Sequence, residues 1–339
     1  MSPQTRSLGD KTFNAIGYGG MGLSIAYGSV GTDEERLKVL DAVYESGCTF
    51  WDTADVYGDN ESLIGKWLKN TGKRNEIFLA TKFGAGGGNS GSTTRMIRGD
   101  PEYVHEAINR SLSKLGVDYV DLYYLHRADR TVPIEHTVAA MAELVRAGKV
   151  KHIGLSEISA STLRRAHAVH PISAIEVEYS PFTLDIEDES IGLLKTAREL
   201  GVKIVAYSPL GRGLLTGRYK SPDDFGEGDF RKLVPRYSKE NFPKILELVD
   251  GLKEIGKKYD ATAGQISLAW VLAQGEDVIP IPGTTKLQNL KENMDAGKIK
   301  LSPEDVQAVR EVADKANAAQ GDRYPEAYMK ALFADTPLP

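Results

Sequence analysis

The sequence predicts a single α/β domain over residues 1–339, folded as a (β/α)8 TIM barrel. Two observations support this prediction. From residue 13 to about residue 300, short apolar segments alternate with helical segments, and eight such pairs can be counted. Eight strand–helix units are typical of a closed parallel barrel. The apolar segments are rich in Val, Ile, Tyr and Phe and mostly lack polar alternation, as expected for strands covered on both faces.

Eight segments have the length and composition of buried strands. In chain order they are residues 15–18, 48–52, 77–82, 120–125, 150–156, 174–178, 203–208 and 278–281. All strand C-termini of a parallel barrel open onto one face, and that face carries the active site in enzymes of this fold. The residues that end these segments are therefore the first candidates for function.

Helical patterns fill the intervals between the strands, for example residues 33–45, 101–115, 134–147, 159–169 and 191–200. Polar residues typical of helix starts mark the beginning of two of them, at Thr32 and Ser159. Glycines typical of helix ends follow the helical patterns at positions 47, 116, 148 and 201.

Three segments depart from the alternation. Residues 6–14 hold a Gly-Asp pair between two short runs, which predicts an N-terminal β-hairpin ahead of the first barrel strand. Residues 211–243 form a long loop after strand seven, rich in Gly, Pro and charge. The C-terminal tail from about residue 314 carries Tyr324, Tyr328 and Phe333 among polar residues. Such a tail can border the mouth of a barrel or simply cover an apolar groove, and both alternatives stay open.

Composition excludes several classes of function. The net charge is −5 and Lys and Arg are scattered, whereas nucleic-acid binding requires a basic face. No apolar run approaches 18 residues, so no membrane span is expected, and the N-terminus lacks the apolar core of a secretory signal. Cys48 is the only cysteine, which favours a reducing, cytoplasmic location. The six histidines form no HExxH motif, and no metal is expected.

Four ionisable residues stand at or just beyond the ends of three successive predicted strands. Asp52 ends the second strand and Tyr57 follows it, Lys82 ends the third, and His126 follows the fourth. Because these strand ends share one face, we expect the four side chains to converge on one pocket. An ammonium and a carboxylate beside a phenol are a means of making tyrosine a proton donor near neutral pH.

A literal GxGxxG motif is present at residues 17–22, and read alone it would indicate a Rossmann-type dehydrogenase with Asp52 as the ribose acid. Residues 23–31 intervene before the next helix, and Asp52 lies 30 residues after Gly22 instead of about 20. None of the fifteen tyrosines has Lys four positions later. We therefore interpret the glycines as residues that let the backbone approach a ligand at the barrel mouth.

With these residues in place, the chain resembles the aldo-keto reductase family from about residue 6 to the tail. The matching motifs are WDTADVYG, ATKFG, LYYLHR, KVKHIGLSE, VEYSPF, VAYSPLGRG and IPGTTKLQNLKEN, in the family's order. Within the family the chain most resembles plant perakine-reductase-like proteins and their fungal and bacterial relatives. The resemblance implies a barrel that reduces aldehydes or ketones to alcohols with NADPH, without metal or flavin. NADH is left open as an alternative coenzyme.

The resemblance also implies a role for each of the four residues. Tyr57 would be the general acid that protonates the carbonyl oxygen, and Lys82 would stabilise its phenolate character. Asp52 would hold Lys82 charged, while His126 would orient the carbonyl by a hydrogen bond. Free tyrosine has a pKa of about 10, so the phenol needs such help. Two donors on one oxygen form a small oxyanion-type site.

The later motifs imply a coenzyme site by the same resemblance. Ser156 would bind the nicotinamide carboxamide, Tyr207 would stack on the nicotinamide ring, and Lys286 would face a 2′-phosphate at a helix start. The coenzyme residues implied are Gly20, Met21, Ser156, Glu157, Glu176, Tyr207, Ser208, Leu210, Gly211, Gly213, Gly283, Thr284, Thr285, Lys286, Glu292 and Asn293. The substrate pocket candidates are Met21, Tyr27, Phe83 and Arg127, for which simple packing is the alternative.

Three positions depart from the family pattern. Glu157 stands where the family commonly has Asn, and Glu176 stands where it usually has Gln. A carboxylate accepts a hydrogen bond from a carboxamide N–H but donates one to its oxygen only when protonated. Asn289 replaces an Arg that many members carry near the adenosine phosphate.

One competing function comes from a different class. Potassium-channel β-subunits resemble this family, and a nucleotide-binding regulatory barrel of that kind keeps the same four residues. The sequence gives about a dozen residues before the first barrel strand. We expect an enzyme acting on a small-molecule carbonyl, with no nucleic-acid or membrane partner. The physiological substrate and the oligomeric state are left open.

Overall fold

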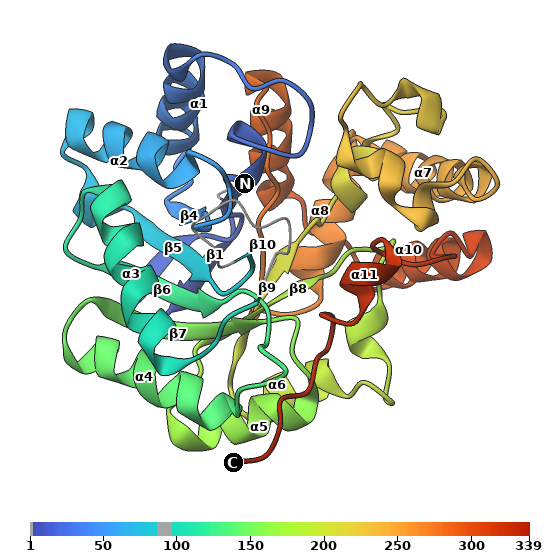
Figure 1. The fold of residues 1–339 in the computed structure, drawn as a ribbon. Helices are drawn as coiled ribbons and strands as arrows, with labels where there is room; N and C mark the ends of the chain where they lie inside the picture. Colours follow the sequence, from blue (N-terminus) through green and yellow to red (C-terminus); the bar gives the residue numbers. More distant parts are fainter. Residues whose placement is uncertain (1–2, 87–96) are drawn as a thin grey trace.

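The computed structural model describes residues 3–86 and 97–339. Eight parallel strands lie at the centre of the molecule and helices surround them (Figure 1). Each strand pairs with its neighbour in sequence, from β3 to β10. The strands are β3 (Tyr18–Gly19), β4 (Phe50–Asp52), β5 (Phe78–Phe83), β6 (Val120–Leu125), β7 (Val150–Ser156), β8 (Ala174–Glu178), β9 (Lys203–Tyr207) and β10 (Val278–Pro280).

The sheet closes on itself between its first and last strands. The N–H of Gly17 donates to the carbonyl oxygen of Pro280 at 2.9 Å, and Gly19 N–H donates to Pro282 at 3.4 Å. The predicted (β/α)8 barrel is confirmed, and the Rossmann alternative is wrong because that fold is an open sheet. Residues 17–22 lead into a single 3-10 turn, η1 (Met21–Leu23), instead of a long helix.

The helices follow the strands as predicted. They are α1 (Asp33–Glu45), α2 (Asn60–Thr71), α3 (Pro101–Leu115), α4 (Ile134–Arg146), α5 (Ala160–Val169), α6 (Leu193–Glu199), α7 (Phe242–Gly256), α8 (Ala263–Ala273), α9 (Leu287–Asp295), α10 (Pro303–Ala316) and α11 (Glu326–Met329). Thr32 closes a capping box with Glu35 at the start of α1, and Ser159 caps α5 by accepting from Thr162 N–H. The first predicted strand, residues 15–18, lies slightly later in the structure, where β3 at Tyr18–Gly19 pairs with Trp51 and Asp52 of β4.

Alternate residues of each strand face two different hydrophobic layers. One layer fills the barrel and includes Phe50, Phe78, Ala80, Leu122, Tyr124, Ala174, Val205 and Ile279. The intervening residues, such as Trp51, Leu79, Tyr123 and Ile175, belong to the layer between the strands and the helices. This period of two fixes which strand-end side chains point into the barrel mouth.

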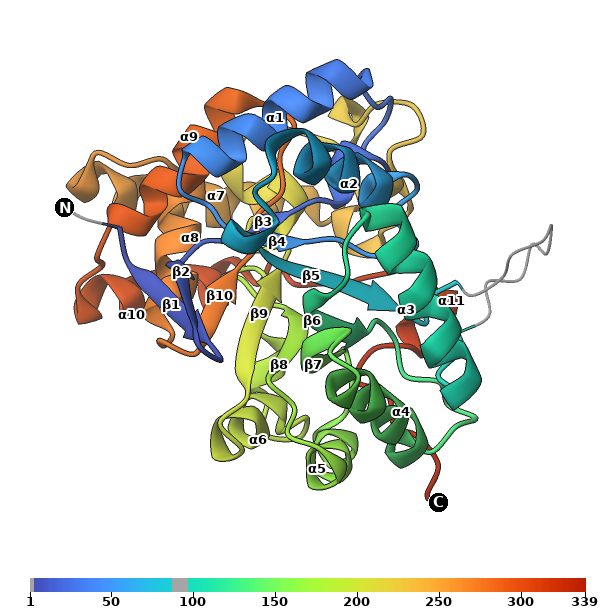
Figure 2. The same cartoon turned by 90° about the vertical axis from the view of Figure 1, so that its left-hand side faces the viewer.

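The predicted N-terminal hairpin covers the opposite end of the barrel. It consists of β1 (Thr5–Leu8) and β2 (Lys11–Asn14), whereas the sequence placed it at residues 6–14. Leu8 and Phe13 join the interior layer, and the Phe13 ring lies 5.0 Å from the ring of Phe50. Figure 2 shows the hairpin at the end away from the arrowheads, so the mouth at the strand C-termini is left to the loops.

The two long segments lie at the mouth. The loop after β9 contains the 3-10 turns η4 (Gly211–Thr216), η5 (Pro222–Asp224), η6 (Phe230–Leu233) and η7 (Pro235–Tyr237). The tail passes through α11 and ends beside α4 and α5 (Figure 1). There the carbonyl of Ala334 accepts from Ser159 N–H at 3.1 Å, next to a bridge between Ala334 and Ile158. Within the described residues, no helix is long and apolar enough to cross a membrane.

Candidate active site

A buried lysine lies at the centre of the barrel mouth, between two carboxyl groups. Lys82 is fully buried near the end of β5, and its ammonium group forms an ion pair with Asp52 at the end of β4. Lys82 Nζ also donates to the carbonyl oxygen of Thr53 at 3.0 Å and lies 3.3 Å from Glu176 Oε2 on β8. We call Asp52, Lys82 and Glu176 the lysine cluster. The side chains of all three residues point into the barrel, because each lies two positions after an interior-facing residue of its strand.

The predicted phenol and imidazole lie beside this cluster. Tyr57 is in the turn after β4, and the centre of its ring lies 5.1 Å from Lys82 Nζ. His126 follows β6 and its backbone N–H donates to Phe83 O at 2.7 Å. The rings of Tyr57 and His126 meet edge to face, with centroids 5.8 Å apart. The structure therefore brings together the four residues that the sequence singled out.

The electrostatics of the lysine cluster follow from burial of one cation with two acids. Burial raises the pKa of Glu176 to about 8, and the charge of Asp52 adds to this effect. Burial alone would lower the pKa of Lys82, but Asp52 and Glu176 raise it above its usual value. Burial likewise raises the pKa of Tyr57, while the charge of Lys82 acts to lower it. The cluster thus holds a permanent ammonium and one carboxyl that keeps a proton near neutral pH.

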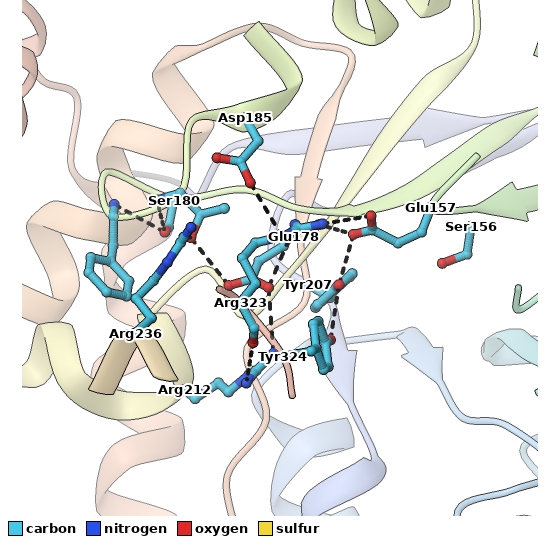
Figure 3. Close-up of polar contacts among 12 residues, drawn as sticks. Ser156, Glu157, Glu178, Ser180, Asp185, Tyr207, Arg212, Arg236, Arg323 and Tyr324 are labelled. Carbon is cyan, nitrogen blue, oxygen red and sulfur yellow. Dashed lines mark hydrogen bonds and ion pairs between the residues drawn. The ribbon is translucent and has the colours of Figure 1, made fainter. Parts of the chain in front are cut away.

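On the other side of the mouth, the ends of β7 and β9 carry the predicted nicotinamide residues. Ser156 ends β7, and its hydroxyl accepts a hydrogen bond from Arg127 Nη1 at 3.1 Å. Tyr207 ends β9, and its phenol donates to Glu157 Oε1 at 2.8 Å (Figure 3). Glu157 is fully buried and its side chain is committed to neighbouring protein groups.

The loop after β9 exposes its backbone through left-handed residues. Ser208, Gly211 and Gly213 have φ values of 49°, 54° and 90°. Leu210, between them, lies near the start of α8: a Cβ added at Gly264 would be 3.6 Å from Leu210 Cδ2 and 3.4 Å from Glu292 Oε1. Two predicted coenzyme residues that are far apart in sequence therefore flank the same helix start.

The residues predicted to lie beside the coenzyme phosphates follow β10 and lead into α9. Gly283 packs against Gly19, since a Cβ at Gly283 would lie 2.4 Å from Gly19 O. Thr284 is held by its carbonyl, which accepts from Tyr18 OH at 2.7 Å, and Thr285 is exposed. Lys286 is the N-cap of α9, where no side chain caps the first turn.

The other two predicted coenzyme residues of this region lie on α9. Asn293 is buried. Glu292 accepts a hydrogen bond from Thr262 Oγ1 at 2.5 Å, which ties α9 to the start of α8. The remaining predicted coenzyme residues, Gly20 and Met21, lie at the end of β3. Gly20 packs closely against Asn60, because a Cβ at Gly20 would lie 2.7 Å from Asn60 Oδ1.

Among the substrate-pocket candidates, Phe83 is a correction. Its side chain is fully buried in the outer layer, stacked on Tyr123 with ring centroids 4.8 Å apart. The reason is strand parity: Lys82 points into the barrel, so the next residue must point toward the helices. Met21 and Arg127 are partly buried near the mouth, and Tyr27 is 38% exposed with the Arg231 guanidinium 5.2 Å from its ring.

Sequence reasoning missed a second group of buried charges. Arg323, in the C-terminal tail, is 2% exposed, and its Nη2 donates to Glu157 Oε2 at 2.8 Å. Its guanidinium also lies 3.7 Å from Glu178 Oε2 and 3.3 Å from Asp185 Oδ2. Arg212 lies 3.5 Å from the same Glu178 oxygen. We call these five residues the arginine cluster, which Figure 3 shows together with Tyr207 and Tyr324. The sequence offered one signal, an Arg beside the aromatic residues of the tail.

The family model for the aldo/keto reductases matches residues 15–314, which covers every barrel strand and the lysine cluster. The chain belongs to the aldo/keto reductase family. Among the described residues, no cluster of three His, Cys, Asp or Glu side chains is suited to a metal ion.

Individual aldo-keto reductases match along nearly the whole chain. Aldo-keto reductase str7 of Strobilurus tenacellus is 59% identical, and the match covers 98% of each protein. Aldo-keto reductase yakc (NADP(+)) of Schizosaccharomyces pombe is 51% identical, with 99% of each covered. The solved structure of the glycerol dehydrogenase AKR11B4 from Gluconobacter oxydans is 26% identical, with a TM-score of 0.84 over 93% of this chain and 97% of that one. The narrower likeness to plant perakine-reductase-like proteins stays a prediction.

Proposed function

We propose that this aldo/keto reductase reduces aldehydes and ketones to alcohols with NADPH, with Tyr57 as the general acid. The observation that carries the proposal is the lysine cluster beside Tyr57 and His126. The name of the S. pombe relative supports NADP(+) as the coenzyme. The substrate class is a small carbonyl compound. The single buried cysteine, Cys48, favours a reducing compartment such as the cytoplasm.

The four residues divide the proton chemistry between them. Tyr57 Oη gives its proton to the carbonyl oxygen as the carbonyl carbon is reduced, which completes the alcohol. Lys82 stabilises the phenolate that this leaves, because its charge lowers the pKa that burial raises. Asp52 fixes the ammonium in place through their ion pair. His126 donates a hydrogen bond to the same carbonyl oxygen, so that two donors stabilise the charge that develops there.

The residues present fit a nicotinamide coenzyme. The first turn of α9 is uncapped by any side chain, and the side chain of Lys286 makes no ion pair or hydrogen bond with the described residues. A helix start with an unengaged cation suits a 2′-phosphate. The left-handed backbone from Ser208 to Gly213 suits close approach of a pyrophosphate. NADPH, when bound, supplies the hydride for the carbonyl carbon.

The coenzyme contacts divide between its two ends. We assign the nicotinamide to Ser156, Glu176 and Tyr207, and place Gly20 and Met21 beside it. We assign the adenosine and its phosphates to Leu210, Gly211, Gly213, Gly283, Thr284, Thr285, Lys286, Glu292 and Asn293. The departure at Glu176 fits this assignment, because a pKa of about 8 keeps that carboxyl protonated at neutral pH. A protonated carboxyl donates to a carboxamide oxygen as the amide of Gln would.

The test compares Tyr57→Phe with Tyr119→Phe, which removes an exposed phenol that bonds Asn75 at 3.2 Å. Consumption of NADPH is followed at saturating coenzyme with a panel of aldehydes and ketones. Tyr57→Phe should lose turnover by about 10²–10⁴-fold, while its Kd for NADPH stays measurable. Tyr119→Phe should behave as the parent. Parent-like turnover in Tyr57→Phe would remove this residue from the acid role. NADPH binding without turnover of any carbonyl would favour the regulatory barrel.

Coenzyme preference is tested by Lys286→Ala, with the exposed Lys300→Ala as its control. The Kd for NADPH should rise by about tenfold and the Kd for NADH should hardly change, since only NADPH carries the 2′-phosphate. Equal weakening of both coenzymes would show that Lys286 does not face that phosphate.

A further inference from the structure

We infer that Arg323 of the C-terminal tail is a positioning residue for the nicotinamide end of the coenzyme, acting through Glu157 and Tyr207. The inference rests on the proposed function and deepens it. It assigns to the tail a task that neither the sequence motifs nor the family match indicated, since the matched region ends at residue 314.

The first step is that Arg323 joins the ends of neighbouring strands. Glu157 directly follows β7, Glu178 ends β8, and Asp185 lies in the loop after β8. One guanidinium reaches all three carboxylates, at 2.8 Å, 3.7 Å and 3.3 Å. In Figure 3 the three acids converge on Arg323 from different sides. Because Arg323 and Glu157 are both buried, water cannot replace either partner at low cost.

The second step is that Glu157 is held in an unusual conformation by tail contacts. Its φ is 51°, a left-handed value that is uncommon for a residue with a side chain. The tail contributes two hydrogen bonds that maintain it: Arg323 Nη2 donates to its carboxylate at 2.8 Å, and Ala334 N–H donates to its carbonyl oxygen at 3.1 Å. Arg323 also lowers the pKa of Glu157, against the effect of burial, so the acceptor stays charged.

The third step connects Glu157 to the residue assigned to the nicotinamide ring. Oε1 of Glu157 accepts from Tyr207 OH at 2.8 Å and from Glu178 N–H at 3.2 Å. The phenols of Tyr207 and Tyr324 lie 3.1 Å apart, so the residue next to Arg323 contacts Tyr207 directly. The Arg212 guanidinium lies 4.5 Å from the centre of the Tyr324 ring and so helps to hold that ring. Tyr207 is therefore held at its hydroxyl, which fixes the line from its Cβ to that hydroxyl and so the position of its ring.

The experiment separates the nicotinamide end of the coenzyme from its adenosine end. The variants are Arg323→Met, Arg323→Lys, Tyr207→Phe and the double variant Arg323→Met with Glu157→Gln. The exposed Arg146→Met on α4 is the matched control. Three quantities are measured: the Kd for NADPH, the Kd for 2′,5′-ADP, and the single-turnover rate of carbonyl reduction with NADPH deuterated at the transferred position.

Arg323→Met should slow hydride transfer by about tenfold or more and expose a larger isotope effect, because a misplaced ring costs the chemical step. Its Kd for NADPH should rise about fivefold, while its Kd for 2′,5′-ADP stays within about twofold of the parent. The double variant should recover part of the loss, since Glu157→Gln removes the charge that Arg323→Met leaves unpaired and keeps an oxygen that accepts from Tyr207. Arg323→Lys should be intermediate.

Two results would overturn the inference. One is an Arg323→Met variant that matches Arg146→Met in hydride transfer. The other is parallel weakening of NADPH and 2′,5′-ADP, which indicates general loss of structure. If Arg323→Met does not fold, Arg323→Lys and Tyr207→Phe decide, and unchanged hydride transfer in both rejects the inference. A parent protein that binds NADPH but reduces no carbonyl would instead reject the proposed function. The role of the tail would then still be tested by comparing the Kd for NADPH with the Kd for 2′,5′-ADP in Arg323→Met and in the parent.

Discussion

The lysine cluster and the arginine cluster each contain a buried glutamate at the barrel mouth, and the pKa values of these two glutamates are shifted in opposite directions. Burial and the charge of Asp52 raise the pKa of Glu176 to about 8, because one lysine serves two acids. Burial acts on Glu157 in the same direction, but Arg323 and Arg127 lower its pKa below the usual value. In the first cluster Glu176 shares one lysine with Asp52 and keeps its proton, whereas Arg323 and Arg127 together keep Glu157 charged. The first arrangement suits proton chemistry, and the second suits rigid positioning.

The largest expected effect comes from removing the only cation of the lysine cluster. Lys82→Met leaves the phenol of Tyr57 without the charge that most lowers its pKa, and turnover should fall by about 10³-fold. The matched control is Lys114→Met, which removes a half-exposed lysine that lies 3.7 Å from Glu61. Steady-state kcat for an aldehyde measures both. A loss of less than about threefold in Lys82→Met would contradict the division of roles between the two clusters.

The next largest effect tests whether the arginine cluster is structural. Glu178→Gln leaves Arg212 and Arg323 without the carboxylate they share at 3.5 Å and 3.7 Å. Breaking a buried charge group in this way costs about 3 kcal/mol of unfolding free energy. Denaturant unfolding compares it with Glu189→Gln, which changes an exposed acid. Equal stability of the two variants would mean that Glu178 does not hold the arginines.

A smaller effect is the pH dependence of folding stability, which should differ between the two glutamates. The folded-state pKa of Glu176 lies above the ordinary value of 4.5, so its contribution to stability is complete below pH 4.5 and is lost as pH rises through about 8. The parent should therefore lose stability relative to Glu176→Gln as the pH rises from about 5 to 9.

Glu157 should show the opposite sign. Its folded-state pKa is lowered, so its contribution to folding stability is present at pH values above the ordinary glutamate pKa of 4.5. That contribution is lost as the pH falls below 4.5 and through the folded-state pKa. The parent should therefore lose stability relative to Glu157→Gln only on acidification. Unfolding curves across the pH range measure both differences, and two curves that bend in the same direction would refute the comparison.

The smallest effect concerns the backbone beneath the lysine cluster. Gly20 N–H donates to Asp52 O at 2.8 Å, and a Cβ on Gly20 would lie 3.0 Å from that oxygen and 2.7 Å from Asn60 Oδ1. Gly20→Ala should cost about 1–2 kcal/mol in unfolding free energy through this crowding. Gly226→Ala is the control, because nothing lies within 4 Å of its Cβ position. Equal stability of Gly20→Ala and Gly226→Ala would show that the backbone at the end of β3 moves to make room for the added methyl group.

The meeting of Asp52 and Lys82 could be predicted because both lie at or near the ends of successive barrel strands, which share one face. Glu176 was predicted only as a coenzyme residue, and its place 3.3 Å from Lys82 Nζ came from the structure. Phe83 was misplaced because both faces of a barrel strand are apolar, so the sequence hid which residues point inward. Lys82 itself settles the parity of β5, since a charged side chain points to the polar mouth and its neighbour to the helices.

The arginine cluster could not be predicted in the same way. Arg323 lies 166 positions from Glu157 along the chain. Glu157 was expected to contact the coenzyme because of its place after Ser156, and the structure instead turns its side chain to the tail. No periodicity of the sequence links Arg323, which lies between α10 and α11, to the end of a strand.

The sequence by itself determined the barrel, its hairpin and the grouping of Asp52, Tyr57, Lys82 and His126, because strand periodicity and strand ends are local properties that the fold maps onto one face. Only the tertiary structure decided the protonation of the two glutamates and the partner of the tail. The reason is that pKa values and buried ion pairs depend on how many charges share a dry volume, and that number is set by contacts between segments far apart in the chain.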